Sequence, residues 1–105
     1  MNNLILTPLH EEFDFLVAAL TALGHHGIPE RIGRLDTLKF ASLNMRLARG
    51  GHGKTQFGIQ TRHLLDHLSE VKLVVCAGAA GGLAPELAVG DVVAATHTHE
   101  HHYNL

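Results

Sequence analysis

The chain has 105 residues, of which 46% are apolar and 17% are charged, and its formal net charge is −2 at pH 7. This length fits one small domain, and so high an apolar fraction excludes an intrinsically disordered protein. The slightly acidic balance argues against nucleic acid as a partner, because affinity for polyanions depends on an excess of Lys and Arg.

The first residues predict a strand, a tight loop and a helix. Residues 4–6 form a short apolar run that ends at Thr7 and Pro8. From residue 10 to residue 23 the apolar side chains follow the 3.6-residue helical period, and Gly24 then supplies a stop. The chain has no run of transmembrane length and no basic flank typical of a signal peptide, so we expect a cytoplasmic protein without a membrane partner.

The middle of the chain predicts a small meander followed by a second helix. Two or three short strands are expected, over residues 31–35, 38–43 and 45–48. Turns between them are expected at Asp36 and Thr37 and at Asn44. Glycines at residues 50, 51 and 53 then break the pattern, and helical spacing resumes from residue 54 to residue 68.

The last third of the chain predicts two more strands. Residues 72–76 are nearly all apolar, as in a central strand covered on both faces, and the single cysteine, Cys76, is expected to be a buried, unreactive thiol. A turn region over residues 85–90 precedes a further strand over residues 91–96. The predicted fold class is therefore α/β, with a mixed twisted sheet flanked by helices and ligand loops at the carboxyl ends of its strands.

A glycine cluster directly follows the strand at residues 72–76. Gly78, Gly81 and Gly82 have no Cβ, so backbone N–H groups at this strand end can approach a ligand closely. The sequence therefore predicts a binding site at this junction.

Two further segments are candidates for chemistry. Glu12 lies just after the first strand, where a carboxylate can orient a water molecule or accept its proton; the alternative is an ordinary acidic residue at a helix start. Gly51-His52-Gly53-Lys54 is superficially like a phosphate loop but lacks the Walker spacing, so a plain turn is the alternative.

Ten histidines raise the question of a metal site. His63 and His67 are one helical turn apart, and His97, His99 and His101 alternate along the chain. The glutamate of a zinc-protease motif is absent and no fourth ligand is defined, so surface histidines are favoured and no metal or other cofactor is expected.

Four segments taken in order resemble the purine nucleoside phosphorylase superfamily, and most closely its 5′-methylthioadenosine/S-adenosylhomocysteine nucleosidase branch. They are residues 4–12, 51–54, 78–85 and 89–93. The specific part is Ala-Gly-Gly-Leu-Ala-Pro followed by Val-Gly-Asp. The resemblance implies a phosphorylase/hydrolase-like fold, a purine nucleoside as substrate and a homo-oligomer.

The resemblance also implies roles for individual residues. Glu12 matches the acidic residue that positions and deprotonates the attacking water. Six residues match substrate-binding positions near the sugar or the base: Leu9, His52, Ala79, Ala80, Gly81 and Leu105. Ala79 stands where the nucleosidases often have serine, and His52 stands where they have an apolar residue.

Water is the expected nucleophile. Phosphorylases of the hexameric branch carry an arginine just before their glycine segment, whereas this chain has Cys76 and Ala77 there. Three alternatives remain open: a phosphate-dependent phosphorylase of the same superfamily, a non-catalytic nucleoside-binding module and a histidine-rich metal binder.

The resemblance covers only part of a family domain, since family members are roughly twice as long. Their later half supplies the residues that grip the ribose hydroxyls and the acid that protonates the leaving base. Residues 1–105 are therefore expected to be the amino-terminal half of an incomplete domain, inactive without a carboxy-terminal half or second chain.

Overall fold

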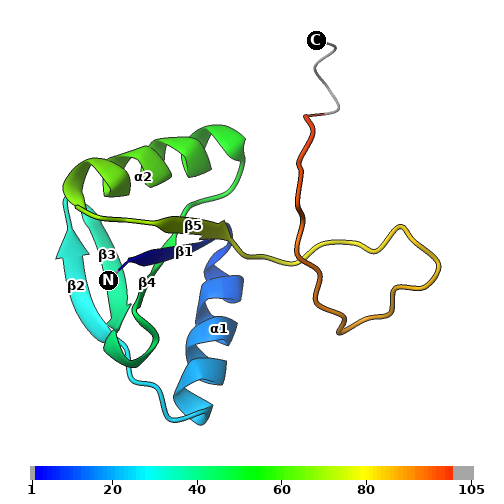
Figure 1. Cartoon of the computed structure of the whole chain (residues 1–105), viewed down its shortest axis with the longest axis horizontal. Coiled ribbons are helices and arrows are strands. Elements are labelled where there is room, and N and C mark those ends of the chain that lie inside the picture. The colour runs from blue at the N-terminus through cyan, green and yellow to red at the C-terminus, as the bar shows by residue number, and fades with distance from the viewer. Residues whose placement is uncertain (1, 101–105) are drawn as a thin grey trace.

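Five strands and two α-helices build the body of the chain in a computed structural model, which describes residues 2–100 (Figure 1). In chain order they are β1 (Asn3–Thr7), α1 (His10–Ala22), β2 (Ile28–Ile32), β3 (Leu35–Phe40), β4 (Met45–Arg49), α2 (Lys54–His67) and β5 (Leu73–Cys76). A single 3₁₀ turn over Ala41–Leu43 links β3 to β4. Both predicted helices are confirmed to within one residue of their expected ends.

The strands form one mixed sheet in the order β2-β3-β4-β1-β5. β1 pairs in parallel with β4 and with β5, whereas β2, β3 and β4 form the predicted antiparallel meander. The predicted α/β class, a mixed twisted sheet flanked by helices, is confirmed. Because β1, β4 and β5 are parallel, their carboxyl ends meet at one edge of the sheet, where ligand sites of α/β proteins are usually found.

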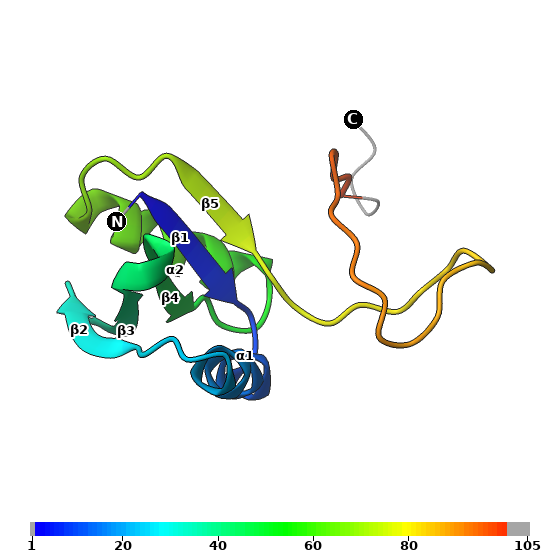
Figure 2. The same ribbon diagram turned by 60° about the horizontal axis from the view of Figure 1, so that its bottom comes forward.

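The two helices lie on opposite faces of the sheet (Figures 1 and 2). Alternation along β1 sends Leu4 and Leu6 to one face, where they form a buried cluster with Ala48 of β4 and Leu64 of α2. On the other face, α1 lies against β4 and β1. The residues that start both helices are thereby held beside the carboxyl ends of β1 and β4.

The turn between β2 and β3 lies three residues earlier than predicted. Asp36 and Thr37 belong to β3, and the chain instead reverses at Gly33 and Arg34. Gly33 has a φ of +57°, a left-handed conformation that costs glycine little. Thr37 is buried, and its hydroxyl donates a 2.7 Å hydrogen bond to the Glu30 carbonyl across the strand pair. The turn predicted at Asn44, with φ of 50°, is confirmed.

The prediction that residues 72–76 form a central, covered strand is wrong. β5 pairs only with β1 and forms an edge of the sheet, where Leu73 is 53% and Val74 is 40% exposed. Cys76 is exposed as well, so its assignment to the core is also wrong. Partial burial, and then the nearby Glu12 carboxylate, raise the pKa of the Cys76 thiol, which favours its protonated, unreactive form.

Residues 77–100 contain no helix or strand and run away from the sheet (Figure 2). The predicted turn region over residues 85–90 is present, with the Leu87 amide donating to the Ala84 carbonyl at 3.1 Å. The predicted strand over residues 91–96 is absent, because no described strand pairs with it and Val92 is 96% exposed. Within residues 2–100, neither helix is long and apolar enough to cross a membrane.

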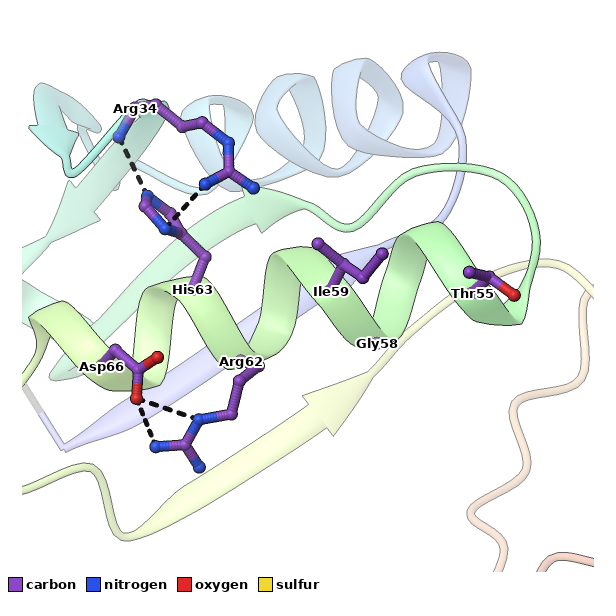
Figure 3. Close-up of a pocket in the computed structure, with 7 residues that line it drawn as sticks. All are labelled: Arg34, Thr55, Gly58, Ile59, Arg62, His63 and Asp66. Carbon is purple, nitrogen blue, oxygen red and sulfur yellow. Dashed lines mark hydrogen bonds and ion pairs between the residues drawn. The ribbon is translucent and has the colours of Figure 1, made fainter.

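His63 of α2 fastens the β2–β3 turn to the helix (Figure 3). The Arg34 backbone N–H donates to His63 Nε2 at 3.0 Å, and the Arg34 guanidinium lies 2.9 Å from Nδ1. Gly33 packs so closely that a Cβ there would lie 2.2 Å from Nε2. Because Nε2 accepts a hydrogen bond, the imidazole is neutral in this arrangement.

Acidification through the ordinary imidazole range, about pH 6.5, is expected to lower the free energy of unfolding through His63. Partial burial, then the charges of Arg34 and His67, lower the pKa of His63, and Asp66 opposes them. The unfolded chain therefore binds this proton at a higher pH than the folded chain. Urea unfolding above and below this pH range measures the loss in the free energy of unfolding. Equal losses in the wild type and in His63→Gln would contradict the role of His63.

Candidate functional site

Glu12 lies at the carboxyl end of β1, in the first turn of α1, and connects two loops. Its Oε1 accepts a 2.8 Å hydrogen bond from the Leu9 backbone N–H, and its Oε2 accepts one of 2.5 Å from the Ala79 backbone N–H. The first bond satisfies an amide at the helix start, as a simple capping residue would. The second bond spans 67 residues of sequence and brings the carboxylate to the glycine cluster after β5.

Gly78 permits this contact because it has no side chain. A Cβ built on Gly78 would lie 2.7 Å from Glu12 Oε2 and 3.2 Å from Pro8 Cδ. Real Cβ atoms essentially never approach oxygen so closely, so only glycine fits without a shift of the loop or the carboxylate. The backbone at this strand end therefore lies directly against the Glu12 carboxylate, and binding of a ligand there stays a prediction.

Leu9 and His52 line one hollow of about 450 Å³. It lies between the loop after β1 and the glycine loop after β4, and its other lining residues are Pro8, His10, Glu11, Leu35, Arg49, Gly51, Gln56 and Gln60. The Gly50 N–H donates to the Thr7 carbonyl at 2.8 Å and so ties the two loops together. Two predicted site residues that are 43 positions apart in the sequence thus share one cavity.

Ala79, Ala80 and Gly81 line a second hollow of about 580 Å³. Its opposite wall is formed by residues 87–93, which follow the same loop. Glu12 links the two hollows, since it binds Leu9 beside the first and Ala79 beside the second. The structure thus divides five of the predicted residues between two hollows, and of these five Leu9 and Ala79 donate hydrogen bonds to the Glu12 carboxylate. Leu105 lies outside the described residues.

Arg49 and His10 were not predicted as site residues, yet both line the first hollow. Arg49 is the last residue of β4, and its guanidinium donates to His10 Nδ1 and lies over the Phe13 ring, 5.8 Å from the ring centroid. His10 Nε2 lies 3.0 Å from the Asp14 carboxylate. The position of Arg49 at a parallel strand end, before a glycine loop, is the sequence signal that could have identified it.

The described histidines do not form a metal site. Among residues 2–100, no group of three His, Cys, Asp or Glu side chains is placed to hold a metal ion. The rings of His63 and His67 lie 4.4 Å apart, and His67 Nδ1 bonds to the His63 carbonyl at 2.8 Å. His97 and His99 lie in the segment without strands, and His101 is outside the described residues.

The sequence of this chain is similar to those of known proteins. Residues 4–104 match the phosphorylase superfamily. A protein named 5′-methylthioadenosine/S-adenosylhomocysteine nucleosidase from Tolumonas auensis is 35% identical over 86 residues, covering 72% of this chain. A protein of the same name from Mycobacterium bovis is 39% identical over 59 residues, or 56% of this chain.

The matches involve only part of each relative. They cover 37% of the Tolumonas auensis protein and 23% of the Mycobacterium bovis protein, so this chain spans well under two thirds of these relatives' length. No solved structure matches the chain significantly.

Proposed function

Because the chain belongs to the phosphorylase superfamily, we propose that it forms the water-activating half of an N-ribosyl hydrolase. The proposed reaction is hydrolysis of the N-glycosidic bond of a purine nucleoside such as 5′-methylthioadenosine or S-adenosylhomocysteine. The names of the matched relatives support this substrate class. The proposed general base is Glu12.

The observation that carries the proposal is the double anchoring of Glu12. Each carboxylate oxygen accepts one backbone N–H, from Leu9 and from Ala79, which sets the position of the group, and no ion pair within residues 2–100 includes it. A carboxylate has about four acceptor positions, so both oxygens keep capacity for a water molecule. A carboxylate held in this way can orient water and take its proton during attack on the sugar.

A second group must complete the chemistry. Glycosidic cleavage passes through an oxocarbenium-like state and needs an acid for the departing base as well as an oriented water. We propose that a carboxy-terminal segment supplies this acid and packs against the open side of β5. The exposure of Leu73 in β5 and of Leu83, Val89 and Val92 beyond it supports such a covering segment. A homo-oligomer is proposed with it, from the family resemblance.

Release of free adenine tests the proposal. The complete protein is expected to release adenine from 5′-methylthioadenosine in phosphate-free buffer, whereas residues 1–105 alone release none. A strict requirement for inorganic phosphate would instead identify a phosphorylase. Nucleoside binding without release by the complete protein would identify a non-catalytic module and overturn the proposal.

A further inference from the structure

The contact between His63 and the β2–β3 turn offers the imidazole more hydrogen-bond donors than it can accept. The Arg34 backbone N–H donates to Nε2 at 3.0 Å, and a guanidinium nitrogen of the same residue lies 2.9 Å from Nδ1 (Figure 3). A neutral imidazole has one acceptor nitrogen, and a protonated imidazole has none. Protonation of His63 would therefore remove the bond to the turn and place two cations in contact.

The other charged groups that face His63 come from α2. The ring of His67 lies 4.4 Å away, and a charge on it adds to the repulsion. Asp66 favours a proton on His63, but its carboxylate is paired with Arg62. Partial burial, then the charges of Arg34 and His67, outweigh Asp66 and lower the pKa of His63. The surroundings of the ring therefore favour the neutral form, which keeps the turn in place.

Arg34 also connects this contact to the first hollow, between the loops after β1 and β4. Its other guanidinium nitrogen donates to Gln60 Oε1 at 3.0 Å. Gln60 lines the first hollow together with Leu35, which follows Arg34 in the chain. The positions of these two lining residues therefore depend on the turn staying against α2.

The end of the β2–β3 hairpin can move without unfolding of the sheet. Residues 38–40 of β3 pair with β4, whereas residues 35–37 pair with β2. The tip of the hairpin thus extends past β4. A Cβ on Gly33 would lie 2.2 Å from His63 Nε2, so the closed turn leaves the ring little room to turn aside.

We propose that His63 and Arg34 form a proton-sensitive latch: protonation of His63 releases the β2–β3 turn from α2 and loosens the wall of the first hollow at Leu35 and Gln60. Release of the turn does not depend on the function proposed above. Its effect on nucleoside binding rests on that function, since the hollow also contains Leu9, whose backbone N–H binds Glu12.

Amide hydrogen exchange of the complete protein, read by NMR at the Arg34 backbone N–H, tests the latch. Between the ordinary imidazole pKa of about 6.5 and the lowered pKa of folded His63, protection corrected for intrinsic exchange is expected to fall by up to about tenfold per pH unit. His63→Gln keeps an acceptor but cannot titrate, so its protection is expected to stay constant. The matched control His26→Gln removes an exposed imidazole before β2 and is expected to behave as the wild type.

Arg34→Gln decides the case in which His63→Gln leaves residue 34 unprotected. It keeps the backbone donor and removes the guanidinium, so the pKa of His63, followed by its NMR signals, is expected to rise and the pH dependence to weaken. An unchanged pH dependence in Arg34→Gln overturns the latch. So does a fall in protection that is absent from the wild type or equal in His63→Gln.

Urea separates local release from global unfolding. Low urea concentrations are expected to leave exchange at Arg34 constant and to speed exchange in β1, which pairs on both sides. Equal protection of Arg34 and β1 overturns the latch.

Bound nucleoside tests the connection to the hollow. In the Glu12→Gln protein, nucleoside at ten times its Kd is expected to raise protection of Arg34 about tenfold, because binding favours the closed turn. Protection that is unchanged by bound nucleoside overturns this connection. Failure to bind any nucleoside overturns only the proposed function, since exchange in the free protein still measures the latch.

Discussion

A complete protein in which Glu12 is replaced by Gln is expected to release adenine about 10²–10⁴-fold more slowly than the wild type. The amide keeps the size of the side chain and one acceptor oxygen, but it cannot take a proton from water. Both backbone donors, the Leu9 and the Ala79 N–H, lose a charged acceptor, and one of them then faces the NH2 group of the amide instead of an oxygen. Steady-state measurement of adenine release, with nucleoside affinity measured separately, separates the loss in kcat from any loss in binding.

Asp36→Asn is the matched control for this experiment. It makes the same change of carboxylate to amide at an exposed residue of β3. Asp36 forms an ion pair with Arg31 of β2 and lies outside the candidate site. We expect the control to retain wild-type kcat. A folded Glu12→Gln protein with wild-type kcat would contradict the role of this carboxylate as the base.

Gly78→Ala is expected to lower kcat about 10²-fold, because it displaces Glu12 from its position. The new methyl group would meet Glu12 Oε2 at 2.7 Å and Pro8 Cδ at 3.2 Å, so either the carboxylate or the loop must move to make room for it. The bond between Ala79 and the carboxylate is the contact most directly broken. Adenine release and the thermal midpoint are measured together, because the loss is expected in kcat with a smaller loss in stability.

Gly58→Ala is the matched glycine control. Gly58 lies in α2, and a Cβ built on it meets nothing within 4 Å. Removing a glycine from a helix interior is expected to raise the free energy of unfolding by about 0.5–1 kcal/mol and to leave kcat unchanged. If both alanine substitutions change kcat equally, activity does not depend on the absence of a side chain at residue 78.

The two helices were predictable because their apolar periodicity is local. Phe13, Leu16, Val17 and Leu20 are half-buried, as the 3.6-residue spacing requires, although Leu23, counted with them, is exposed. The β2–β3 turn was misplaced because Asp36 and Thr37 have the composition of a turn. Burial of Thr37 in β3, with its hydroxyl bonded to Glu30, overrides that preference.

The errors in the carboxy-terminal third concern which strands lie next to one another. An apolar run such as Leu73–Cys76 is equally compatible with a central or an edge strand, since the order of strands is a property of the whole sheet. Residues 91–96 have strand composition, but a strand exists only with a pairing partner. Local sequence carries neither piece of information.

The closeness of Glu12 to the glycine cluster was predictable because it depends on backbone geometry. Glu12 and the glycine cluster follow parallel strands β1 and β5, whose ends lie side by side. Arg49 was missed because a charged residue at a strand end usually faces solvent, and only the tertiary structure shows that it shares a hollow with His52. The division of Leu9 and Ala79 between two hollows also depends on the path of residues 77–100.

The open side of β5 has a consequence for biosynthesis. Its unpaired main-chain groups and exposed Leu73 can recruit a strand from another molecule as readily as one from the same chain. If the carboxy-terminal segment proposed above closes this edge, its closure competes with aggregation during translation, and slow closure at high protein concentration favours aggregation. Low expression temperature and simultaneous production of the proposed covering segment are accordingly expected to improve the yield of unaggregated protein.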